Sequence, residues 1–115
     1  MSQLQIDQIK AAYQSLGLKP IQSLFFFRHD GTDYACPLVA VALARGQFDR
    51  NDRRIAIDGG ANAALEWAVT QWGEPFVIGF LDGFDGRAPS KADPEYREGF
   101  DLGVAAEQEL SPQAP

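Results

Sequence analysis

The sequence predicts a single, mostly helical α+β domain with about five helices and one β-hairpin. Apolar residues recur at helical spacing in several segments, and one Asp-Gly dipeptide separates two runs of β-forming residues. The chain has 115 residues, of which 45% are hydrophobic, which is enough for one buried core. Residues 1–110 are therefore expected to form one domain, and residues 111–115 a frayed tail.

The first helix is predicted over residues 3–16. Isoleucine, tyrosine and leucine side chains recur there at three- and four-residue intervals, which places them on one helical face. Gly17 suits the left-handed residue that ends a helix, and Pro20 prevents the helix from continuing.

A β-hairpin is predicted over residues 23–36. The aromatic run SLFFFR is followed by Asp-Gly, a dipeptide that suits both central positions of a type I′ turn. This turn would place Arg28 opposite Asp33 and Phe27 opposite Tyr34.

The three consecutive phenylalanines of this hairpin raise a question about partners. Successive strand residues face opposite sides, so Phe26 must point away from Phe25 and Phe27. Either helices cover both faces of the hairpin, or one face is exposed and marks a surface for a partner.

Two helices are predicted in the middle of the chain. Pro37 suits the first turn of a helix, and the segment PLVAVALAR is apolar on all sides, so we expect it at the centre of the domain. A second helix is expected over about 59–72, with Asp58 as its N-cap. Residues 55–57 are either a short third strand or the apolar lead into that helix.

Two similar helices are predicted at about 75–85 and 94–109, each after an acidic residue followed by proline. Each carries two glycines four residues apart beside an aromatic ridge. Glycine in a helix costs about 1 kcal/mol relative to alanine. We expect this cost to be offset by packing, because the glycines let two helix backbones approach closely in an αα-hairpin, within one chain or across a dimer. The residues expected to pack there and to form an interaction surface are Phe76, Gly79, Phe80, Gly83, Phe84, Tyr96, Gly99, Phe100 and Gly103.

Cys36 and His29 are the candidate catalytic residues, because they are a conventional pair of nucleophile and base. Cys36 precedes a predicted helix, whose N-terminus would lower the pKa of the thiol. The predicted hairpin keeps the pair apart, because Cys36 pairs near Phe25 while His29 lies at the other end of the strands. No catalytic site is therefore predicted, and a thiol-dependent enzyme using Cys36 is kept as an alternative function.

Asp82, Asp85 and Asp93 are the candidate metal ligands, since Ca²⁺ binds carboxylates. Their spacing departs from the EF-hand loop, in which the third and fifth positions counted from Asp82 would be Phe84 and Gly86. A Ca²⁺-responsive domain using Asp82 and Asp85 is a second alternative function, and no metal or cofactor is predicted.

The charge of the chain argues against several classes of partner. A net charge of −6 disfavours binding to nucleic acid or to anionic lipid, both of which need clustered lysine and arginine. The sequence has no signal-peptide pattern, no long apolar run and one cysteine, so a cytoplasmic location is expected. Because no catalytic groups converge, the predicted function is a non-enzymatic interaction module that binds a protein partner or a second copy as a homodimer.

Overall fold

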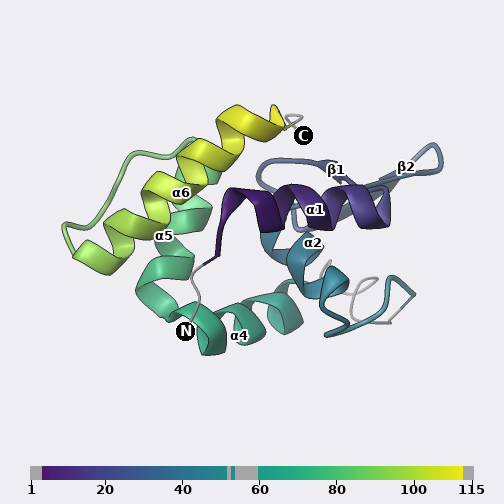
Figure 1. Ribbon diagram of the computed structural model, residues 1–115, viewed down its shortest axis with the longest axis horizontal. Coiled ribbons are helices and arrows are strands. Elements are labelled where there is room, and N and C mark those ends of the chain that lie inside the picture. The colour runs from purple at the N-terminus through teal and green to yellow at the C-terminus, as the bar shows by residue number, and fades with distance from the viewer. Residues whose placement is uncertain (1–3, 52, 54–59, 113–115) are drawn as a thin grey trace.

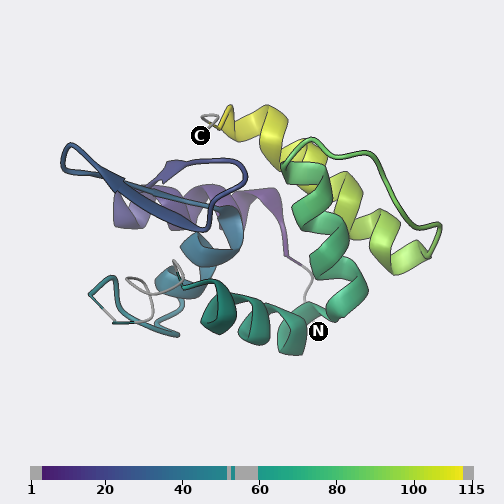
Figure 2. The ribbon, with the colours of Figure 1, turned by 180° about the vertical axis from the view of Figure 1, so that it is seen from behind.

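The computed structural model describes residues 4–51, 53 and 60–112, and the predicted α+β fold class is confirmed. Five helices and a small three-stranded sheet are found in this part of the chain. Figure 1 shows α5 and α6 side by side at one end of the molecule and the β2–β3 hairpin at the other. Figure 2 shows the same arrangement from behind.

Helix α1 spans Ile6–Leu16 and begins three residues later than predicted. The Gln8 side chain accepts a hydrogen bond from the backbone N–H of Gln5 at 3.0 Å, which fixes the start of the helix there. Gly17 ends the helix in the left-handed conformation, with φ of 65°, as predicted.

The predicted β-hairpin is confirmed. Strands β2 (Phe26–His29) and β3 (Thr32–Ala35) pair in antiparallel fashion and place Arg28 opposite Asp33 and Phe27 opposite Tyr34. Both turn residues have positive φ, 50° and 75°, as a type I′ turn requires.

Strand β1 (Lys19–Pro20) was not predicted. It pairs in parallel with β3, so the strand order is β1-β3-β2 and the hairpin strand β2 lies at an edge. A strand of two residues, one of them proline, has no alternating pattern from which it could be recognised.

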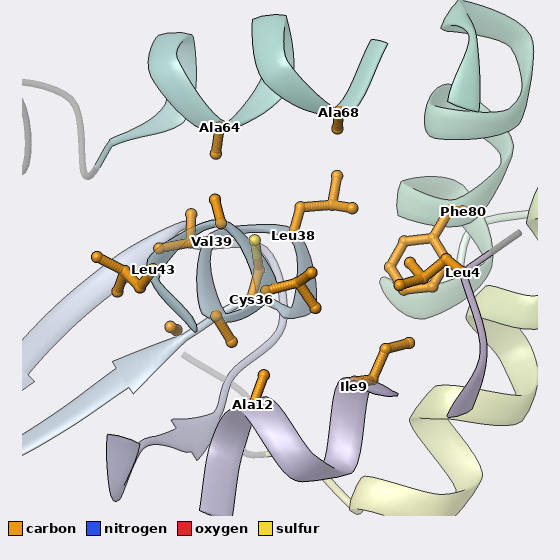
Figure 3. Close-up of a cluster of buried hydrophobic side chains, with 14 of the residues drawn as sticks. Leu4, Ile9, Ala12, Cys36, Leu38, Val39, Leu43, Ala64, Ala68 and Phe80 are labelled. Atoms are coloured by element: carbon orange, nitrogen blue, oxygen red, sulfur yellow. The ribbon is translucent and has the colours of Figure 1, made fainter. Parts of the chain in front are cut away.

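Helix α2 (Pro37–Ala44) is the buried centre of the fold, as predicted, because its residues from Pro37 to Leu43 are buried on every side of the helix. Figure 3 shows Leu38 and Val39 on the side of α2 that faces α4, where Ala64 and Ala68 point back at them. The alanines let the two helices approach closely.

Helix α4 spans Ala61–Trp72 and ends at Gly73, and its first residue lies two positions after the predicted start. Gly60, in a left-handed conformation, is its N-cap. The predicted cap Asp58 and the apolar segment 55–57 lie outside the described residues, as do residues 113–115 of the predicted tail.

The last two helices are α5 (Glu74–Phe84) and α6 (Pro94–Leu110), close to the predicted bounds. Within the described residues, none of the helices combines the length and the apolar character needed to cross a membrane.

Candidate functional site

The glycines of α5 and α6 let the two backbones touch, which confirms the predicted packing. A Cβ atom added at Gly99 would overlap the carbonyl oxygen of Phe76 and lie 2.8 Å from its carbonyl carbon. One added at Gly79 would lie 3.0 Å from the backbone nitrogen of Phe100. Gly83 and Gly103 meet the opposite backbone in the same way. We call this contact between the two helices the glycine seam.

The aromatic ridges close the glycine seam on its flanks. Phe76, Phe80, Phe84 and Tyr96 are buried, and Phe100 is half-buried. The Phe80 and Phe84 rings stack with centroids 6.2 Å apart. All nine residues predicted to form this surface therefore pack within one chain. That they also bind a partner stays a prediction.

The three candidate metal ligands are separated, each with its own partner inside the fold. Asp82 accepts a hydrogen bond from the buried Tyr96 hydroxyl at 2.6 Å. Asp85 accepts one from the backbone N–H of Ser23 at 2.9 Å. Asp93 is the N-cap of α6 and accepts from two backbone N–H groups of its first turn. Among the described residues, no group of three or more histidine, cysteine, aspartate or glutamate side chains is placed to hold a metal ion.

Further hydrogen bonds that sequence analysis did not predict hold the α5–α6 connection and the end of α5 in place. The Ser90 backbone N–H donates to the Tyr96 hydroxyl at 3.1 Å, so the connecting loop is held against the helices. Gln22 donates from its side-chain amide to the carbonyl oxygen of Phe84 at 2.7 Å, which joins the segment after β1 to the end of α5. These hydrogen bonds tie α5, α6 and their connecting loop to one another and to the segment after β1.

The candidate catalytic pair is not brought together, as the predicted hairpin register implies. The Cys36 backbone N–H donates to the carbonyl oxygen of Phe25 at 2.9 Å, at the base of the hairpin, whereas His29 pairs with Thr32 beside the turn. Cys36 is only 3% exposed, and burial raises the pKa of its thiol to about 12. A thiol held in this state is a poor nucleophile near neutral pH.

One face of the hairpin is fastened to the rest of the fold by charge. The Arg28 guanidinium donates to both carboxylate oxygens of Asp33, at 2.6 and 3.3 Å. Arg50, which follows α2, donates to the same carboxylate at 2.9 Å and draws the chain against this face. The Arg28 guanidinium also lies 5.7 Å from the centre of the Phe26 ring. These two arginines lower the pKa of Asp33, chiefly through the hydrogen bond from Arg28.

The opposite face of the hairpin is aromatic and open to solvent. The Phe27 ring stacks on His29, with centroids 5.8 Å apart, and contacts Tyr34 across the strands at 6.1 Å. Phe27 is 41% exposed and Leu24 is 38% exposed, and these are the large apolar side chains that the described part of the chain leaves exposed. We call Phe27, His29 and Tyr34 the aromatic face. Of the two arrangements considered for the phenylalanine run, the structure has the one with an exposed face.

Two of the surface hollows formed by described residues were considered as candidate sites, and neither gathers catalytic groups. One, of about 380 Å³, lies between α1 and α2 and is lined largely by alanine, serine and valine, with Arg45 at its rim. The other, of about 540 Å³, lies beside the turn after α2 and includes Phe48 and Arg50. Neither brings a nucleophile and a general base together, so neither resembles an enzyme active site.

No model of a known protein family matches this chain, and comparisons with curated proteins and with solved structures found no match either.

Proposed function

We propose that this protein is a small non-enzymatic interaction module that binds another polypeptide through the aromatic face of its hairpin. The observation that carries the proposal is the exposure of Phe27, stacked on His29 in β2, in a fold whose described residues bury most of their other large apolar side chains. Exposed aromatic and aliphatic side chains beside a polar rim are typical of protein-binding surfaces.

The state of the reactive side chains supports a binding role rather than catalysis. Cys36 is buried with a raised pKa, and His29 lies at the other end of the hairpin. A thiol-dependent enzyme would need this thiol exposed and its pKa lowered. The candidate Ca²⁺ ligands Asp82 and Asp85 are engaged with Tyr96 and Ser23, so a Ca²⁺-responsive domain would have to break these contacts.

The geometry of the hairpin also suits a binding surface, because the aromatic face is held in place from behind. The Arg28–Asp33–Arg50 cluster fixes the opposite face of the same two strands. Phe27 is stacked on His29 before any partner arrives, so binding would immobilise few additional side chains.

A photocrosslinking experiment tests the proposal. Phe27 is replaced by p-benzoylphenylalanine in the full chain, and the exposed Gln14 on α1 is replaced in the same way as a control. We expect irradiation to produce an adduct from position 27 that maps to one defined peptide and that position 14 does not give. If position 27 gives no adduct beyond those of position 14, the aromatic face is not a binding surface.

A further inference from the structure

Among the described residues, no strand other than β3 pairs with β2, whose outer edge is left without a partner strand. In the order β1-β3-β2, β3 is the strand that pairs with β2 among the described residues. Antiparallel pairs alternate between hydrogen-bonded and non-hydrogen-bonded positions. The hydrogen bond from the Cys36 N–H to the Phe25 carbonyl oxygen shows that Phe25 occupies a hydrogen-bonded position. Phe27 and His29 therefore bond to β3, while the backbone N–H and C=O groups of Phe26 and Arg28 point away from the sheet.

This edge lacks several of the features that protect exposed strands from pairing. The strand Phe26–His29 contains no proline and no lysine, and its four pairs with β3 run without a bulge. Its charged residue, Arg28, is neutralised by Asp33. The opposite edge strand, β1, consists of Lys19 and Pro20, and proline lacks a backbone donor.

We propose that β2 pairs with β2 of a second copy of this chain, in antiparallel orientation about a two-fold axis that passes beside Phe27. This inference rests on the proposed function and names the polypeptide that the aromatic face meets. In this register each Phe26 lies opposite Arg28 of the second copy, and the two residues exchange backbone hydrogen bonds. Four backbone hydrogen bonds then join the two copies.

The side chains are complementary to themselves in this register. Phe27 faces Phe27 of the second copy at a non-hydrogen-bonded position, where opposing side chains are closest and aromatic pairs are favourable. The Phe26 and Arg28 side chains share the other face, where a guanidinium over an aromatic ring is already present within each strand. The contact between Arg28 and Phe26 that each copy makes within its own strand would thus be repeated between the two copies.

Charge favours this face over others for contact between two copies. The chain carries a net charge of −6, so two copies repel each other at most orientations. At the hairpin the carboxylate of Asp33 is matched by Arg28 and Arg50, which leaves this region without excess negative charge. A strand of four residues makes a small interface, so the dimer is expected to be weak and to dissociate on dilution.

The first measurement is sedimentation velocity of the full chain over a range of concentrations from about 10 to 500 µM, chosen for an interface of this size. Wild type is expected to shift from monomer to dimer across this range. Phe27→Glu places two carboxylates opposite each other and is expected to raise the dissociation constant at least about tenfold. Gln14→Glu adds the same charge on α1 and is expected to leave dimerisation unchanged. A wild-type chain that stays monomeric, or a dimer that Phe27→Glu leaves intact, overturns the proposal.

A second measurement uses only the wild-type chain and so does not depend on how Phe27→Glu folds. Amide hydrogen exchange of Phe26 and Arg28 is expected to slow as protein concentration rises, because dimerisation gives these N–H groups acceptors. Exchange that is independent of concentration at both positions overturns the proposal. A monomeric chain that still forms the specific photocrosslink at position 27 would retain the proposed function while excluding a second copy as the partner.

Discussion

Substitution of Gly99 by alanine is the sharpest test of the glycine seam, because it adds one methyl group at the closest backbone approach. The new Cβ would overlap the carbonyl oxygen of Phe76 and lie 2.8 Å from the carbonyl carbon. Ordinary contacts need about 3.4 Å or more, and a backbone carbonyl cannot rotate away as a flexible side chain can. Helices α5 and α6 must therefore move apart.

The expected cost follows from two opposing effects. Alanine in place of glycine in a helix stabilises it by about 1 kcal/mol. Overpacking in a close-packed interior costs about 1–3 kcal/mol, and backbone against backbone belongs at the upper end. Separation of the helices also weakens contacts of the buried Phe80 and Tyr96 rings. The net expectation is a loss of about 2 kcal/mol of unfolding free energy, out of a total of about 5–15 kcal/mol for a domain of this size.

Urea unfolding followed by circular dichroism and by tryptophan fluorescence measures this change. Glu98→Ala is the matched control, because Glu98 is exposed on the same helix and its replacement is expected to change the unfolding free energy by less than about 0.5 kcal/mol. The double variant Gly79→Ala with Gly99→Ala should cost less than the sum of the single variants, since either methyl group already separates the helices. A Gly99→Ala chain as stable as wild type, or more stable, would refute the direct backbone contact.

Three further predictions concern the hairpin and the core. The Tyr13 hydroxyl donates to the carbonyl oxygen of Ala35 at 2.7 Å in a buried position, so Tyr13→Phe should lower the free energy of unfolding in urea by about 1–2 kcal/mol; no loss would mean that the carbonyl finds another donor. The pKa of Asp33 is lowered in the folded state, chiefly by the hydrogen bond from Arg28. The ionised carboxylate therefore stabilises the fold at neutral pH, and this stabilisation is lost as pH falls from about 4 through the lower pKa that Asp33 has in the folded state. Urea unfolding should therefore find Asp33→Asn less stable than wild type at pH 7, with the difference shrinking towards pH 2, and a difference independent of pH would contradict this assignment. Burial raises the pKa of the Cys36 thiol to about 12, so iodoacetamide at pH 8 should modify it slowly in the native chain and rapidly in urea, whereas fast native alkylation would restore the thiol-enzyme alternative.

The parts of the fold that were predictable from sequence are those specified by neighbouring residues. The Asp-Gly turn determines the register of the hairpin through the backbone angles it requires, and the paired glycines of α5 and α6 imply their close approach. Pro37 and Gly73 likewise mark helix ends through their own conformational preferences.

The parts that could not be predicted depend on residues distant in the sequence. The pairing of β1 with β3 and the contact of Arg50 with Asp33 join segments that no local pattern connects. For the candidate site, alternation along the phenylalanine run indicated that the hairpin has two apolar faces. Whether helices cover both of them is decided by where α1 and α2 lie, so the exposure of Phe27 emerged only from the tertiary structure.

The glycine seam also restricts how this segment of the sequence can change during evolution. Replacement of any of the four glycines is expected to cost stability where one backbone touches another, while ridge residues can exchange for others of similar volume. A Gly-Xaa₃-Gly pair, repeated twenty residues later after an acidic residue and proline, is therefore a signature of this helical hairpin. Distant relatives whose overall sequences have diverged should be recognisable by that spacing.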